Sequence, residues 1–323
     1  MNKTKKTILA IVLMVYIILF MSFFYFQPSV GIVEGSGTVL SDNWWEALNW
    51  IKNNTNECAV IATYWDPGHF ITGIAERPVI FDGATQNSAI YLQSNDTGPK
   101  HLITENYDKG ITQIILEGEN SSQRARIKDI GIILYTGNES LALKYLKDYK
   151  KPGCSEMYFI ASADLVGKSH WWTYFATWNP IDKGNAITYR PVSRSQAKPI
   201  ISENTIVHTF YVGEDASGQI HQYIIYEKNQ SYSAYYQVGN NFYTVNKLVY
   251  LGDGLLRTFD NAEVSGTILL WPNKNYLIHI PAELEDSMFT KMFFFDGQGL
   301  KNFEYVNNWG GEVKLFRVKF DSQ

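Results

Sequence analysis

The 323-residue sequence lacks the short motifs that mark most enzyme classes. It contains no phosphate-binding glycine loop, no G-x-S-x-G elbow, no H-E-x-x-H helix and no Cys/His spacing typical of a metal site. The six histidines are scattered, and although a Ser-His-Asp triad needs only to meet in space, nothing in the sequence nominates one. We therefore predict no catalytic residue and no metal ligand in this chain.

An excess of basic residues is also missing. The formal net charge is −4, with 28 Lys and Arg against 32 Asp and Glu. A nucleic-acid-binding surface needs clustered positive charge, so we expect no nucleic-acid partner. With 45% hydrophobic and 15% aromatic residues, the chain can instead bury a sizeable core.

Charge is absent from the nineteen residues Ile8 to Phe26. At a rise of 1.5 Å per residue, such a run is long enough for one bilayer-spanning helix, and we assign residues 8–30 to it. The alternative is a cleaved signal peptide, but the run exceeds a typical signal core and no clear small-x-small cleavage site follows it. We expect a retained single-pass anchor.

Positive charge lies on one side of this segment only. Lys3, Lys5 and Lys6 precede it, and the next basic residue is Lys52. By the positive-inside rule, residues 1–7 form a cytoplasmic tail and the soluble part is extracytoplasmic, at the cell membrane.

Cysteine is almost absent, with Cys58 and Cys154 the two examples. An extracytoplasmic location permits a disulfide between them. Each precedes an apolar run typical of a strand, so a bridge is possible if those strands are neighbours. Two buried free thiols are the other possibility, and the sequence does not decide between them.

The rest of the chain divides by composition. A Gly/Ser-containing linker at residues 31–40 leads to a predicted helix, where Asn43 and Glu46 have the spacing of a capping box. Over 41–180, short apolar runs alternate with helical stretches, which predicts a mixed α/β core. Over 181–323, β-branched and aromatic runs punctuated by turns predict a β-rich unit. The predicted fold class is α+β with a single N-terminal transmembrane helix.

The stretch YWDPG, which starts at Tyr64, has the chemistry of a hydroxyl-binding pocket. Trp65 offers an indole N–H donor and a flat wall, and Asp66 offers a carboxylate. A hydroxyl donating to such a carboxylate makes a charge-assisted bond of roughly 1.5 to 3 kcal/mol. The structural alternative is that Asp66 caps a helix beginning at Pro67, since proline is favoured at the first helical position.

A family resemblance favours the pocket. The segment YWDPGHFITGIAERPVIFDGAT resembles the Trp-Trp-Asp-Tyr-Gly region of oligosaccharyltransferase catalytic subunits, especially archaeal ones. SDNWWEALNWIKNNT is similar to the helix after the last transmembrane helix of that family, and TKMFFFDGQGLKNFEYV to a block near its C-terminal end. The resemblance therefore covers most of the predicted soluble part.

Residue by residue, the resemblance implies that Tyr64, Trp65 and Asp66 occupy the three pocket positions. In the family this pocket grips the Ser or Thr of the acceptor sequon Asn-x-Ser/Thr. Pro67 replaces the tyrosine of the motif and Gly68 matches its glycine, whereas Tyr64 departs from the family's first tryptophan. Whether position 64 donates a hydrogen bond or only lines the pocket is left open by this departure.

A second segment, SADLVGKSHWWTYF, resembles the family's short acceptor-binding helix that carries an Asp and a Lys. Asp164 and Lys168 are the matching residues, with a spacing one residue longer than the common form. Trp172 stands where a later Met or Ile is expected. At i and i+4, Asp164 and Lys168 could equally form an ordinary surface ion pair.

The resemblance implies a function in protein N-glycosylation. The chain would recognise acceptor sequons, and glycan transfer from a polyprenyl-linked oligosaccharide would need a multi-helix membrane partner. In the family that partner carries the divalent metal, so Mn or Mg is expected for the complete enzyme and no cofactor for this chain. The alternative function is that of a non-catalytic membrane-anchored ectodomain binding glycan or peptide.

Overall fold

The computed structural model describes residues 11–17, 20–22, 40–84, 89–91, 103–104, 114–115, 123–154, 156–178, 183–195, 199–202, 204–252 and 254–320. Contacts within the chain separate a first unit, residues 1–45, from a second, residues 46–323. Residues 11–17 of the first unit are helical, and the rest of the predicted membrane segment lies largely outside the described residues. No helix within the described ranges is both long and apolar enough to cross a bilayer.

The first described helix after the linker is α3 (Asp42–Asn54). It begins at Asp42, and the Trp44 amide donates to Ser41 Oγ at 3.2 Å. The serine hydroxyl thus serves the first turn in the manner of an N-cap, and Asn43, which we expected to start a capping box, is already helical. Farther along, α3 buries Ala47, Leu48 and Ile51 on one face, as its apolar spacing predicts.

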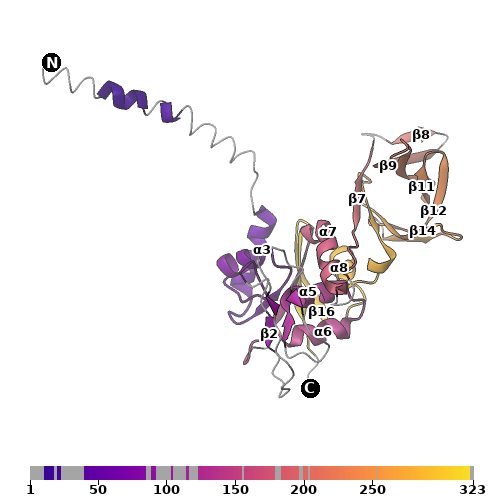
Figure 1. Ribbon diagram of the computed structural model, residues 1–323. Helices are drawn as coiled ribbons and strands as arrows, with labels where there is room; N and C mark the ends of the chain where they lie inside the picture. The colour runs from indigo at the N-terminus through magenta and orange to yellow at the C-terminus, as the bar shows by residue number, and fades with distance from the viewer. Residues whose placement is uncertain are drawn as a thin grey trace. The chain divides into compact units, whose positions relative to one another are not determined.

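A four-stranded sheet forms the centre of the α/β part, in the order β1-β6-β17-β16, and Figure 1 labels its edge strand β16. Strands β1 (Val60–Ala62) and β6 (Met157–Ser162) are parallel, with Ile61 opposite Tyr158. Strand β6 also pairs antiparallel with β17 (Val313–Val318), which pairs antiparallel with β16 (Phe303–Trp309). The predicted β-rich region therefore supplies strands to this sheet as well.

Helices and short strands surround this sheet. The helices are α4 (Gly68–Phe70), η2 (Ile71–Ala75), α5 (Arg126–Tyr135), α6 (Glu139–Lys147), α7 (Asp164–Gly167), α8 (Ser169–Thr177), η5 (Ala282–Leu284) and α9 (Met288–Phe295). Strand β2 (Ala89–Tyr91) pairs with β5 (Gln123–Ala125), and β3 (Ile103–Thr104) with β4 (Ile114–Ile115). Buried side chains of β6, α5, α8 and α9, among them Phe159, Ile130, Trp172 and Phe289, share one hydrophobic core.

The second sheet has nine strands, in the order β7-β15-β14-β12-β11-β10-β9-β8, with β13 paired to β12. Its members are β7 (Arg190–Ser193), β8 (Ile200–Ser202), β9 (Thr205–Glu214), β10 (Ile220–Lys228), β11 (Ser231–Val238), β12 (Asn241–Tyr250), β13 (Leu255–Thr258), β14 (Val264–Leu270) and β15 (Tyr276–Ile280). We call it the barrel sheet, because the chain just after β7 also meets β9. Arg194 bridges Phe210, and the Ser195 amide donates to the Thr209 carbonyl at 2.8 Å.

The barrel sheet has an apolar inside and an apolar outer patch. Along β15, Leu277 joins the core enclosed by the barrel sheet, whereas Ile278 and Ile280 join the core of the α/β part. Such alternation is what the period of two along a strand requires when both faces are covered. The mixed α and β fold that we predicted, with its β-rich part, is confirmed.

Candidate functional site

The candidate site lies where β1 and β6 end. Because the two strands are parallel neighbours, their carboxyl ends meet at one edge of the sheet. Asp66 follows β1 and Asp164 follows β6. The backbone after β6 is also held to the β16–β17 turn, since the Ala163 amide donates to the Glu312 carbonyl at 2.8 Å.

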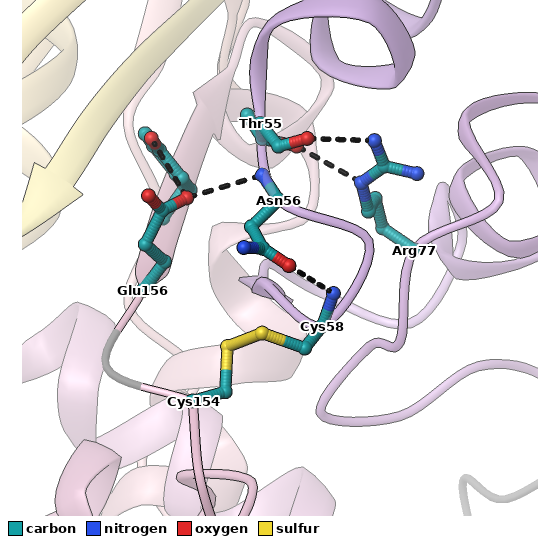
Figure 2. The surroundings of a disulfide bond; sticks show 7 residues. Thr55, Asn56, Cys58, Arg77, Cys154 and Glu156 are labelled. Atoms are coloured by element: carbon teal, nitrogen blue, oxygen red, sulfur yellow. Dashed lines mark hydrogen bonds between the residues drawn. A yellow bond between two sulfur atoms is a disulfide. The ribbon is translucent and has the colours of Figure 1, made fainter.

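A disulfide and a helix-end contact fix the entry to β1 (Figure 2). Cys58 and Cys154 are joined, with their Cα atoms 5.9 Å apart, which decides the alternative that the sequence left open. The Asn56 amide donates to the Glu156 carboxylate at 3.2 Å. Arg77, buried, donates to the carbonyls of Lys52 and Thr55 at the end of α3, at 2.6 and 2.8 Å. These contacts hold β1 beside β6.

The turn after β1 has the form that Pro and Gly predict. The Gly68 amide donates to the Trp65 carbonyl at 3.1 Å, and Pro67 has the helical φ of −74°. Gly68 packs so closely that an added Cβ would lie 2.6 Å from the Phe81 carbonyl oxygen and 2.8 Å from Asp82 Cα. At this position only glycine lets the turn lie against the segment 81–82.

Asp66 does not cap the helix that follows. Among the described residues, no side chain makes a capping hydrogen bond at the start of α4. The carboxylate instead contacts Lys168, whose Nζ lies 2.8 Å from Asp66 Oδ2. Lys168 Nζ also lies 2.9 Å from Asp164 Oδ2, so one cation bridges two carboxylates. We call Trp65, Asp66, Asp164 and Lys168 the β1–β6 site.

The bridge shapes the electrostatics of the site. Partial burial alone would lower the pKa of Lys168, but its contacts with the Asp66 and Asp164 carboxylates and their negative charges outweigh it and hold that pKa above its usual value. Lys168 therefore stays protonated at neutral pH. With two carboxylates against one ammonium, the site has a formal charge of −1, which suits a hydrogen-bond donor as ligand.

One carboxylate oxygen of the site is incompletely satisfied. Asp66 Oδ2 is inaccessible to solvent, and its contact with Lys168 is close enough for an ion pair but not directed as a hydrogen bond. No described residue gives it a well-aligned donor. Asp164 differs, because Ser162 donates to its Oδ1 at 2.5 Å. The Asp66 side chain is nevertheless 30% exposed, so Oδ1 is the oxygen that a ligand hydroxyl could reach.

Tyr64 is a buried residue next to Trp65 and Asp66. Its side chain is only 2% exposed and packs edge-on against Phe81, with ring centroids 6.1 Å apart. Burial and the neighbouring Asp66 charge raise the pKa of its hydroxyl well above the usual value. Trp65 is the half-buried aromatic residue at this position, packed against the main core.

The two tryptophans after Lys168 have different surroundings. Trp172 is fully buried, and its indole N–H donates to the Leu165 carbonyl at 2.9 Å, so it is a core residue. Trp171 is 51% exposed and stacks on Phe175. Sequence reasoning named neither Trp171 nor Ser162, and the place of Ser162 at the end of β6 was the available signal.

Archaeal glycotransferases resemble this chain in sequence. The chain is 26% identical to a dolichyl-phosphooligosaccharide-protein glycotransferase of Methanocaldococcus jannaschii, over 82% of this chain and 32% of that protein. It is 25% identical to the protein of the same name from Methanococcus voltae, over 93% and 38%. An alignment of 103 positions, which covers 29% of this chain and 14% of a related Pyrococcus horikoshii glycotransferase, has 35% identity. The resemblance inferred from the motifs is confirmed.

The chain spans about a third of the length of the first two of these relatives and less of the third. A scan against protein-family models finds no match. Among solved structures, the C-terminal domain of C. jejuni PglB aligns at 14% identity over 85% of this chain and 99% of that domain, with a TM-score of 0.46. The C-terminal globular domain of an Archaeoglobus fulgidus oligosaccharyltransferase aligns at 12% identity over 87% and 100%, with a TM-score of 0.37.

Proposed function

We propose that this chain recognises the acceptor sequon Asn-x-Ser/Thr as part of an oligosaccharyltransferase for protein N-glycosylation. The observation that carries the proposal is the Asp66 carboxylate, whose Oδ2 is held against Lys168 while the side chain as a whole stays 30% exposed. A Ser or Thr hydroxyl would donate to the exposed oxygen, Oδ1. The similarity to archaeal glycotransferases supports this choice of ligand.

The proposed roles follow from position. Asp66 accepts a hydrogen bond from the hydroxyl, and the Trp65 indole either donates to the same hydroxyl or packs against it. Lys168 and Asp164 position Asp66, and Gly68 allows the turn its close packing. Tyr64 supports Trp65 from the core side. Holding the sequon beside the donor sugar is a proximity effect, so these residues transfer no proton.

Glycan transfer requires more than the described residues offer. The resemblance implies Mn or Mg in the complete enzyme. Within the ranges that the structure describes, no three His, Cys, Asp or Glu side chains are grouped so as to hold a metal ion. These residues do not fit the metal, and we assign it, together with the docking of the polyprenyl-linked oligosaccharide, to a multi-helix membrane partner.

The proposed arrangement places the chain at the cell membrane. Residues 8–30 would span the bilayer, with 1–7 in the cytoplasm and 31–40 as a linker. The parts at 41–180 and 181–323 would both be extracytoplasmic. The disulfide between Cys58 and Cys154 supports this location, because disulfides persist in oxidising compartments.

The test compares two acceptor peptides that differ by one hydroxyl. We expect the protein to bind an Asn-x-Thr peptide at least about tenfold more tightly than the Asn-x-Val peptide, because valine matches threonine in shape but leaves Asp66 unpaired. Asp66→Asn should abolish this preference, as measured by calorimetric titration. Asp260→Asn, which removes an exposed carboxylate outside the site, is the matched control.

Retention of the threonine preference in Asp66→Asn would contradict the proposal. It would leave the alternative of a membrane-anchored ectodomain that binds glycan or peptide through other residues. Glycan transfer observed only on co-expression with a multi-helix membrane partner would support the wider assignment.

A further inference from the structure

A cavity of ≈470 Å³ lies between the outer face of the barrel sheet and the segment around α9. Its lining comes from β12, β13, β14 and β15 on one side and from residues 285–298 on the other. It shares no residue with the β1–β6 site. Cavities of this size at the junction of two structural layers commonly hold small ligands.

The polar part of the cavity consists of three side chains that contact one another. Lys247 Nζ lies 2.8 Å from Glu285 Oε2, and the Thr267 hydroxyl donates to Glu285 Oε1. The Glu285 side chain is 18% exposed and therefore held in place, whereas Lys247 is 37% exposed and has two further N–H groups. The group thus offers fixed acceptors and donors side by side.

The lining also has apolar side chains. They include Phe294 and Ile280, both buried, and Leu256, which is 57% exposed. Ile280 lies directly across the strand pair from Thr267, Leu256 lies on the short strand β13, and Gln298 is an exposed amide. The cavity therefore places apolar side chains beside polar groups able to donate and to accept.

We propose that this cavity binds a neutral carbohydrate of one or two sugar units. A pyranose ring has an apolar C–H face and a rim of hydroxyls that both donate and accept, which is what the lining provides. The site would be a second, glycan-directed site, independent of sequon recognition at Asp66.

Charge argues against the other ligand classes. The lining carries Lys247 as a cation but Glu285, Asp286 and Asp296 as carboxylates, so an anionic ligand would be repelled. Of these carboxylates, Glu285 is held by Lys247 and Asp296 by Lys314, 2.6 Å away, so a cationic peptide side chain would have the exposed Asp286 alone to pair with. A neutral polyol can add hydrogen bonds to these pairs without breaking them.

The test is a titration of the full chain with methyl mannoside, methyl glucoside and N-acetylglucosamine, followed by backbone amide NMR shifts. We expect saturable shifts at Thr267 and Gln298 with at least one neutral sugar, at a Kd of about 1 to 10 mM. Gln298→Ala and Leu256→Ala change exposed rim residues and should weaken binding about threefold or more while the protein stays folded. Asp260→Asn should bind as the unchanged protein does.

Three results would overturn the proposal. They are no saturable shift with any neutral sugar at about 100 mM, equal binding of glucuronate, or displacement of the sugar by trilysine. Loss of threonine preference in Asp66→Asn has no bearing on this site, and sugar binding should be the same in that variant. Failure of the two proposals is therefore distinguishable.

Discussion

Lys168 Nζ lies 2.8 Å from Asp66 Oδ2 and 2.9 Å from Asp164 Oδ2, so a single ammonium group joins the ends of two parallel strands. The i,i+4 pair of Asp164 and Lys168 that the sequence predicts does exist, but it is half of a three-residue bridge. The other half is the contact with Asp66, which lies in the segment after β1, far earlier in the chain than Lys168. The recognition that we propose and the local stability would thus depend on the same cation.

Replacing Lys168 by methionine should weaken both peptide binding and the stability of the fold. The variant leaves two partly buried carboxylates facing each other without a counter-charge, so Asp66 loses its fixed orientation. We expect affinity for an Asn-x-Thr peptide to fall about threefold to tenfold and the melting temperature to drop by a few degrees. Calorimetric titration and thermal unfolding measure the two effects.

The control is Lys144→Met, which removes an exposed lysine on α6 and should change neither quantity. Unaltered or tighter peptide binding in Lys168→Met would show that the cation competes with the hydroxyl for Asp66 and does not position it.

A pair of glycine substitutions tests the turn at Gly68. An alanine there would place its Cβ 2.6 Å from the Phe81 carbonyl oxygen, whereas at Gly73 an added Cβ meets no atom within 4 Å. We expect Gly68→Ala to lower the free energy of unfolding by about 1 to 3 kcal/mol and to weaken peptide binding. Gly73→Ala should be close to neutral in both. Urea unfolding that gives equal midpoints for the two variants contradicts the close packing.

The disulfide should contribute strongly to stability. It closes a loop with a sequence separation of 96 residues, and in the chain-entropy account a loop of this length contributes up to about 4 to 5 kcal/mol. The double variant Cys58→Ala/Cys154→Ala should therefore unfold at a clearly lower urea concentration than the oxidised protein. Adding a thiol reductant should lower the midpoint of the unchanged protein but not that of the double variant. A midpoint of the unchanged protein that is insensitive to reductant contradicts this account.

Stability should also fall in mild acid, because of His208. Burial lowers the pKa of this imidazole, as do the charges of Lys274 and Arg194, although Glu227 opposes them at 3.1 Å. The unfolded chain, with a histidine pKa of about 6.5, then binds more protons than the folded one below that pH. The contribution is complete above about pH 6.5 and is lost as the pH falls through the lower folded-state value. Burial shifts the pKa of His279 in the same direction.

Urea midpoints at about pH 5 and about pH 7 measure this slope. The slope should be smaller in His208→Gln, and it should persist in His69→Gln, which changes a histidine whose side chain is 55% exposed. An unchanged slope in His208→Gln would assign the acid sensitivity to other groups.

The sequence predicts the elements of this fold better than their pairing. The runs around Ile61, Phe159 and Tyr223 lie in β1, β6 and β10 as their apolar and β-branched residues indicate. Helix α6 begins after Asn138, whose side chain accepts from the amides of Ser140 and Leu141, as an N-cap should. These are local signals, and each is readable within a few residues.

Long-range contacts left no such local signal. The meeting of Asp66 with Lys168, the return of β17 to β6 and the contact of Ser195 with Thr209 join segments that are distant in the chain. The family motif predicted a pocket at both Tyr64 and Asp66, but Tyr64 packs edge-on against Phe81, which no spacing rule connects to it. Packing, not pattern, decides which aromatic residue faces the site.

The pairing of β6 with β17 also sets the order in which the protein can fold during synthesis. Hairpins of the barrel sheet, such as β9 with β10, join neighbours in the chain and can form as soon as both strands have left the ribosome. The loop that carries Asp164 is tied to Glu312 and Val313, which are made about 150 residues later. The sequon recognition that we propose would therefore be a late event in the biosynthesis of this chain, and nascent forms that end before β17 should lack it.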